Sequence, residues 1–163
     1  MEVFSCTSVS IENLDLSWNR IYLPGALILA ELIKKDFPSL RVLDLAWNCL
    51  SKAPPLDAKQ EALLAKKASD KRTKKNYVEE APEAMLGNKW GEALAFNTKL
   101  VHLDLSFNRI DYHDSLALSK GIVENQTLFG LHYQGNMGRI DSLGYLHPIE
   151  EAFFQNPRTW HFS

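Results

Sequence analysis

Residues 100–110 read LVHLDLSFNRI, an arrangement of leucines and one asparagine that decides how the whole chain folds. Three other segments share its pattern, L-x-x-L-x-L-x-x-N-x-L: IENLDLSWNRI at 11–21, LRVLDLAWNCL at 40–50 and, in degraded form, LFGLHYQGNMG at 128–138. In the last segment Tyr133 and Gly138 replace aliphatic residues. The four asparagines are 29, 60 and 28 residues apart. Two of these intervals are nearly equal and the third is about twice as long. A pattern that recurs at such regular spacing indicates a repeat architecture.

Each segment predicts a short β-strand followed by a turn. In Leu14-Asp15-Leu16 the apolar residues alternate with a period of two, so both leucines face inward. The asparagine closes the turn, where its amide can bond to backbone groups of the loop and of a neighbouring repeat. A single unit cannot bury its apolar face, so the repeats must stack.

Helical spacing follows the predicted strands. Residues 26–37 carry an apolar stripe that begins after a turn with Pro24-Gly25. We expect further helices over residues 83–96 and around residues 118–122, where the apolar residues again recur at helical intervals.

A strand and a full helix within 28 or 29 residues resemble the ribonuclease-inhibitor-like subfamily of leucine-rich repeats. The resemblance covers residues 11–50 and 83–138. It implies an α/β leucine-rich-repeat solenoid with short parallel strands on the concave face and helices on the convex face. It also implies a function in binding rather than in catalysis.

The interval of 60 residues is long enough to hold an extra repeat. The pattern would place Asp70, Thr73 and Lys75 at its apolar positions, so we expect no extra strand there. We instead predict a single domain over residues 1–163 with a helical or disordered insertion at about 52–82 and an atypical C-terminal cap at about 139–163. We expect no full cap before the first strand.

The predicted insertion contains a basic run. Six of the residues 66–75 are basic and one is acidic. The basic ones are Lys66, Lys67, Lys71, Arg72, Lys74 and Lys75. Three interpretations stay open: a nuclear-localisation-like run, a patch for an acidic surface such as nucleic acid, tubulin or actin, and a solvated charged hairpin. Nucleic acid is the weakest of these partners, because arginine forks and interleaved aromatic residues are scarce here.

Length and composition restrict the class of protein. A chain of 163 residues with 45% apolar residues can bury one core, and its formal charge of −2 gives no electrostatic reason to expect nucleic acid or a membrane as partner. No run of about 18 apolar residues and no signal-peptide pattern occurs. Two cysteines are too few for a disulfide framework. We therefore expect a cytoplasmic protein, with cytoskeletal, ciliary and nuclear locations left open.

The candidate binding surface is the exposed face of the predicted sheet. Trp18, Trp47 and Phe107 precede the asparagine in three repeats and predict an aromatic stripe. Exposed aromatic residues at a fixed repeat position are hot-spot candidates for a protein partner. The alternative is that the rings pack against the neighbouring loop as part of the core of the repeats.

The same face carries carboxylates and imidazoles. Asp15, Asp44 and Asp104 form a column of like charge, which loop amides can compensate or a basic partner can meet. In the fourth repeat His132 takes this position, beside Asp104 and diagonal to His102. Two histidines and one carboxylate can bind a metal, but no fourth ligand is evident, so we expect no metal site and no other cofactor.

No motif indicates catalysis. The sequence has no glycine-rich phosphate loop, no G-x-S-x-G elbow and no H-E-x-x-H helix. We predict a non-enzymatic module that binds a protein partner, as a scaffold or assembly subunit of an intracellular, cytoskeletal or ciliary complex. The resemblance leaves one alternative, a regulator of an enzyme such as a GTPase activator or inhibitor, although those families have longer arrays.

Overall fold

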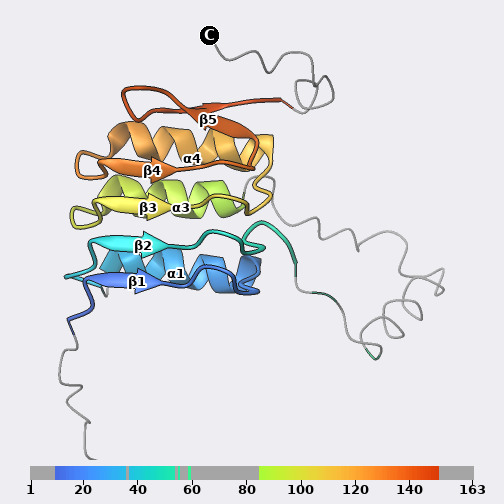
Figure 1. Cartoon of the computed structure of the whole chain (residues 1–163), viewed down its shortest axis with the longest axis horizontal. Helices are drawn as coiled ribbons and strands as arrows, with labels where there is room; N and C mark the ends of the chain where they lie inside the picture. The colour runs from blue at the N-terminus through green and yellow to red at the C-terminus, as the bar shows by residue number, and fades with distance from the viewer. Residues whose placement is uncertain (1–9, 36, 54, 56–58, 60–84, 151–163) are drawn as a thin grey trace, which may run out of the picture.

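Four short parallel strands form the sheet that the repeats predict. The computed structural model describes residues 10–35, 37–53, 55, 59 and 85–150. Its parallel strands are β1 (Asn13–Asp15), β2 (Val42–Asp44), β3 (His102–Asp104) and β4 (Gly130–His132). They lie side by side in sequence order (Figure 1), and their register aligns the leucines Leu14, Leu43, Leu103 and Leu131. The predicted α/β fold with parallel strands is confirmed.

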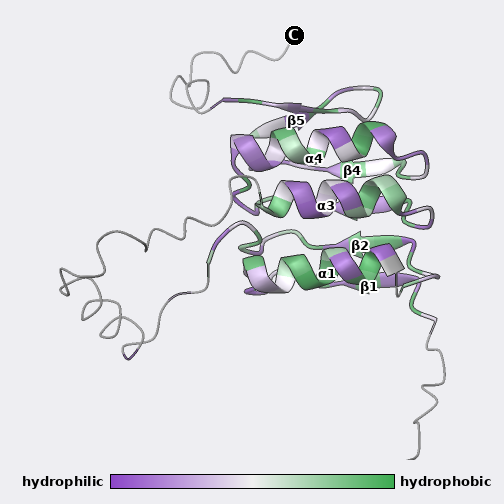
Figure 2. Cartoon of the chain, turned by 180° about the vertical axis from the view of Figure 1, so that it is seen from behind, coloured by the Kyte–Doolittle hydropathy of each residue, from purple (hydrophilic) through white to green (hydrophobic). Residues whose placement is uncertain are grey.

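Helices cover one face of this sheet. They are α1 (Leu23–Lys35), α3 (Met85–Phe96) and α4 (Tyr112–Glu124), seen from their own side in Figure 2. The predicted turn at Pro24-Gly25 is wrong: both residues belong to the first turn of α1. Proline is tolerated there because the first N–H groups of a helix have no helical partner. None of the described helices is long and apolar enough to cross a bilayer.

The sheet passes directly from the second repeat to the third. β2 pairs with β3, with Leu43 opposite Leu103, so no strand is inserted between them. Behind the sheet α3 packs between α1 and α4, and the Lys34–Glu92 ion pair links α1 to α3. Most of the predicted insertion at 52–82 lies outside the described residues.

Buried asparagines tie each repeat to the one before it. Their Nδ2 groups donate across the repeat boundary over 2.8–2.9 Å: Asn48 to the Leu16 carbonyl, Asn108 to the Leu45 carbonyl and Asn136 to the Leu105 carbonyl. Among the described residues, Asn19 in the first repeat is exposed and donates to carbonyls of its own repeat. The asparagine of the pattern therefore joins the second, third and fourth repeats each to the repeat before it.

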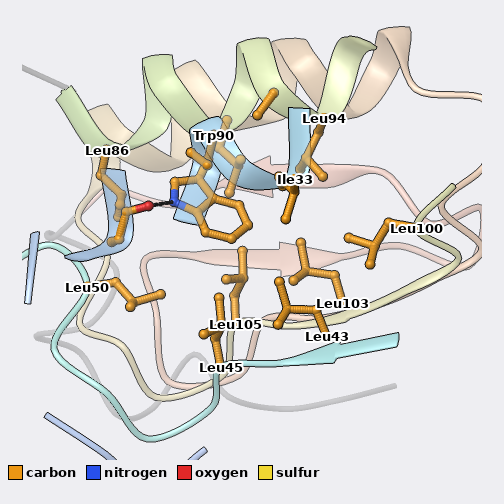
Figure 3. Packing of buried hydrophobic residues seen from close by; sticks show 14 of the residues in the cluster. Ile33, Leu43, Leu45, Leu50, Leu86, Trp90, Leu94, Leu100, Leu103 and Leu105 are labelled. Carbon is orange, nitrogen blue, oxygen red and sulfur yellow. Dashed lines mark hydrogen bonds between the residues drawn. The ribbon is translucent and has the colours of Figure 1, made fainter. Parts of the chain in front are cut away.

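The core lies between the sheet and the helices, and Trp90 of α3 is its largest fully buried side chain (Figure 3). The indole contacts the cluster formed by the inward leucines of the strands and the apolar faces of α1 and α3. Its Nε1–H donates to the Ala26 carbonyl in α1 over 3.0 Å. The one polar atom of the ring is thereby satisfied, as a buried tryptophan requires.

Helices α3 and α4 approach each other so closely that their contact requires glycine. A Cβ atom on Gly121 would lie 2.0 Å from the carbonyl oxygen of Gly91. A Cβ atom on Gly87 would lie equally close, at 2.0 Å, to the carbonyl oxygen of Asp114. Because the obstructing atoms belong to the backbone of close-packed helices, a larger residue would push α3 and α4 apart.

A carboxylate of α4 caps the neighbouring helix. Asp114 Oδ1 accepts a hydrogen bond from the Gly87 N–H over 2.8 Å, in the first turn of α3. The N–H groups of a first turn lack helical partners, so this bond satisfies one of them. Burial raises the pKa of Asp114 in spite of the hydrogen bond.

We expect Asp114→Asn to gain stability relative to the wild type as the pH rises from about 4 to about 7. The raised pKa means that the folded protein holds this proton more tightly than the unfolded chain. The free energy of unfolding of the wild type therefore falls as the pH rises above the ordinary value of 3.8 towards the folded pKa. Asparagine keeps an acceptor and does not titrate. Urea unfolding of both proteins at several pH values checks this, and a difference that is independent of pH would contradict it.

The two ends of the sheet differ. Beyond β4 an antiparallel hairpin of β5 (Gly138–Ile140) and β6 (Leu146–Pro148) packs on α4 and places Leu146 in the core cluster. At the other end β1 is the outermost strand of the described residues, and Leu14 is only partly buried whereas Leu43 is fully buried. Residues 151–163 of the predicted cap lie outside the described residues.

Candidate functional site

Trp18, Trp47 and Phe107 stack on one another just beyond the carboxyl ends of β1, β2 and β3. The ring centroids of Trp18 and Trp47 are 4.5 Å apart with an interplanar angle of 11°. Those of Trp47 and Phe107 are 4.1 Å apart with an angle of 15°. The exposed fractions of the three residues are 73%, 43% and 36%. We call these three residues the aromatic ladder; its rings pack on each other and also reach the surface.

The backbone of the aromatic ladder is left-handed. The φ angles of Trp18, Trp47 and Phe107 are 56°, 58° and 58°. The fourth repeat has Gly135 at this position, with a φ of 74°. A Cβ atom on Gly135 would lie 2.4 Å from the Phe107 ring, so the glycine makes room for that ring and ends the ladder. Glycine is the residue that such a backbone favours, and three repeats carry a bulky ring instead.

The energetic balance is clearest at Trp18. A side chain in the left-handed region costs about 1–2 kcal/mol, and one stacked aromatic pair contributes about 0.5–1.5 kcal/mol. Burial adds little, because Trp18 is 73% exposed. The backbone cost and the stacking gain at Trp18 are therefore of similar size. The rings stack across neighbouring repeats, as the packing interpretation expects, and they also stay accessible to solvent, as the binding interpretation requires. The binding role itself stays a prediction.

We expect Trp18→Gly to change the free energy of unfolding by less than about 1 kcal/mol, because the relief of the left-handed backbone offsets the lost stacking. Trp47→Gly should cost more, since the Trp47 ring has a stacked neighbour on each face. Urea unfolding of both variants measures the difference. A loss of about 3 kcal/mol or more in Trp18→Gly would show that the ring is chiefly a structural element.

The three aspartates lie in register on the outward face of the sheet. Each carboxylate accepts a hydrogen bond over 2.7–2.8 Å from the N–H two residues later: Ser17 to Asp15, Ala46 to Asp44 and Ser106 to Asp104. The hydrogen bonds from Ser17 lower the pKa of Asp15. The loop amides predicted to compensate the column are thus present. The ion pairs among the described residues use other carboxylates, so no cation of this part of the chain neutralises the column.

The two histidines meet as the register predicts. In the strand register His132 lies opposite Asp104, and the ring centroid of His132 lies 4.9 Å from that of His102. Gly130 pairs with His102, and a Cβ atom there would lie 2.4 Å from the imidazole, so the glycine leaves room for the ring. Within residues 10–35, 37–53 and 85–150, no group of three or more His, Cys, Asp or Glu side chains could hold a metal ion.

The predicted basic patch at Lys66, Lys67, Lys71, Arg72, Lys74 and Lys75 lies outside the described residues. The three interpretations of this basic patch therefore stay predictions from the sequence. The candidate site consists of the aspartate column and the histidine pair on the outward face of the sheet, with the aromatic ladder in the turns just beyond the carboxyl ends of the strands.

Comparison with known proteins identifies the repeat. Residues 38–53 and 96–112 match a family model described as leucine rich repeat, and these segments contain β2 and β3. No curated protein and no solved structure matches the chain. Two matches over the strands, together with the parallel register, support a leucine-rich-repeat family for this chain, whose repeats indicate a module for protein–protein interaction.

Proposed function

We propose that this chain is a non-enzymatic module that docks a protein partner on the outward face of the sheet, with the aromatic ladder at the centre of the contact. Trp18 carries the proposal, because its ring is 73% exposed and its backbone is left-handed, with a φ of 56°. Strained backbone is typical of functional sites, and tryptophan is enriched among the residues that dominate interface energies.

The surroundings of the aromatic ladder support the same function. An apolar cluster flanked by polar and charged side chains is the usual layout of an interface. Here the aspartate column and the histidine pair supply the polar part from the same strands. The ladder residues come from three different repeats, so the stacked repeats are what assemble the surface.

We extend the proposal to an assembly role. Helices α1 and α4 have 13 residues each, and this length supports the ribonuclease-inhibitor-like subfamily, whose repeats occur in cytoskeletal and ciliary assemblies. The alternative, a regulator of an enzyme such as a GTPase activator or inhibitor, is tested by adding the chain to a Ran-type GTPase, and an acceleration of hydrolysis would favour that alternative. Imaging of a tagged chain tests the location: a signal on microtubules or cilia supports it, and a diffuse cytoplasmic or a nuclear signal contradicts it.

The decisive test is quantitative capture of protein partners from the source cell. A variant with Trp18→Ser, Trp47→Ser and Phe107→Ser should retain at least tenfold less of the captured partner than the wild type, since each hot spot contributes about 2 kcal/mol or more. Trp18→Ser alone should show most of the effect with little change in stability. Undiminished capture by both variants would contradict the proposal.

Three further variants complete the design. Val123→Ser and Phe129→Ser change exposed apolar residues outside the ladder and should leave capture unchanged. Deletion of residues 52–82 should also leave capture unchanged. If this deletion alone abolished capture, and capture by the wild type fell steeply with salt, the partner would bind the basic run instead.

A further inference from the structure

The outer face of Trp18 is the open end of the aromatic ladder. Its inner face stacks on Trp47, and at the opposite end Gly135 lies against Phe107. Trp18 is also the most exposed member of the ladder. A planar group placed on this face would extend an existing stack, and none of the three rings would need to turn.

The aspartate column gives this surface a row of negative charge. Asp15, Asp44 and Asp104 stand directly opposite one another on adjacent strands, which are about 4.8 Å apart. Like charges in directly opposite positions destabilise a sheet. Within the described part of the chain no lysine, arginine or histidine forms an ion pair with them. A cation supplied by a partner would relieve this repulsion.

The occupant that fits both features carries a flat positive charge. We propose, building on the function proposed above, that an extended arginine-containing segment of the partner docks here, with its guanidinium groups stacked on Trp18 and donating to the carboxylates of the column. The guanidinium group is planar and delocalised, so it can stack on an aromatic face and pair with a carboxylate.

Other side chains can interact with the aromatic ring or with the carboxylates, but not with both. Lysine carries the charge but has no plane to stack, and phenylalanine has the plane but leaves the carboxylates unpaired. A second copy of this chain is also a poor fit. Docked through the same face, it would bring the carboxylates of Asp15, Asp44 and Asp104 against those of the other copy, and like charges repel.

Calorimetric titration of the full chain with four synthetic peptides tests the proposal. The peptides have the sequence Gly-Ser-X-Ser-X-Ser-Gly with blocked ends, where X is arginine, lysine, citrulline or phenylalanine. Alternate positions of an extended peptide face the same side, so both X residues can reach the surface together. We expect the arginine peptide to bind and the other three to bind at least about tenfold more weakly.

Variants of the chain locate the binding. Trp18→Ala and Asp15→Asn should each weaken the arginine peptide about tenfold. Asparagine keeps the acceptor for the Ser17 N–H, so Asp15→Asn removes the charge alone. Tyr145→Ala and Glu124→Gln are matched exposed controls away from the ladder and should bind as the wild type does.

Four results would overturn the proposal. They are equal binding of the lysine or citrulline peptide, tighter binding of the phenylalanine peptide, no heat from the arginine peptide at about 1 mM, and an equal loss of binding in the control variants. The proposed function fails separately. The proposed function is contradicted if the ladder variants still capture the partner protein. If the ladder variants lose capture but the arginine peptide does not bind the wild type, only the present inference is contradicted.

Discussion

Trp90→Ala should lower the free energy of unfolding by about 3–5 kcal/mol, the largest effect that we expect from any single substitution in the chain. Two terms add to this loss. The truncation leaves a cavity where the largest fully buried side chain was, between the strand leucines and the helices. It also removes the donor to the Ala26 carbonyl in α1. Because Trp90 belongs to α3 and Ala26 to α1, the loss weakens the contact between these two helices.

Phe96→Ala is the matched control for Trp90→Ala. Phe96 is an aromatic residue of the same helix, but it is 68% exposed and its ring faces the Lys34 ammonium 5.2 Å away. This substitution should cost less than about 1.5 kcal/mol. Urea unfolding followed by circular dichroism gives both values. Similar losses in the two variants would mean that α3 does not anchor the core through Trp90.

The second large effect concerns the asparagine of the pattern. Asn108→Ala should cost about 2–5 kcal/mol, because buried backbone groups lose their partners. Asn108 Nδ2 donates to the carbonyls of Leu45 (2.8 Å) and Leu105 (3.0 Å), and the residue is fully buried. The Leu45 carbonyl belongs to the preceding repeat, so the substitution loosens the joint between two repeats.

Asn19→Ala tests whether that joint is the cause. Asn19 occupies the same position of the first repeat, is exposed and donates only to Leu16 and Ser17 carbonyls of its own repeat. We expect a loss below about 1 kcal/mol for this variant. Equal losses at Asn19 and Asn108, measured by the same urea method, would show that the asparagine acts within its own turn and not between repeats.

The strands and their register could be predicted from the sequence because the repeat constrains them twice. The period of two in Leu14-Asp15-Leu16 sets which face is buried, and the recurring asparagine sets where each strand ends. The neighbourhood of His132, Asp104 and His102 followed from the register alone. These features depend on the spacing of residues along the chain, which can be counted directly in the sequence.

Contacts between the helices could not be predicted in the same way. Gly91 and Gly121 were ordinary helix residues in the sequence, and only their close backbone approach shows why glycine is needed. The role of Asp114 as the cap of α3 was missed for the same reason, since its partner Gly87 lies 27 residues earlier. Such contacts depend on how far apart two helices lie.

A second set of asparagines was also missed, although the sequence carries a signal for it. Asn97 and Asn125 follow α3 and α4, and each donates to a carbonyl of the preceding helix, Ile33 (2.7 Å) and Leu94 (2.6 Å). Both are also followed three residues later by a leucine of the repeat, in NTKL and NQTL. Comparing the repeats over their full length would have found this pattern.

The left-handed backbone of the aromatic ladder had one visible signal. Gly135 stands where the other repeats have Trp18, Trp47 and Phe107, and a glycine at a fixed repeat position indicates a backbone that other residues adopt at a cost. The stripe itself was predicted, but not the stacking. Whether neighbouring rings stack or splay depends on the φ angle, which the residue types alone do not determine.

The indole N–H resonances of the tryptophans test the docking surface most directly. Trp18 and Trp47 are exposed, whereas the Trp90 N–H is buried and bonded to Ala26, so the three report on different places. Resonances are assigned from single tryptophan-to-phenylalanine variants, including Trp160→Phe. On titration with the captured partner, the signals of Trp18 and Trp47 should shift or broaden while that of Trp90 stays in place. Saturable binding that leaves both ladder signals unmoved would contradict the aromatic ladder as the docking surface.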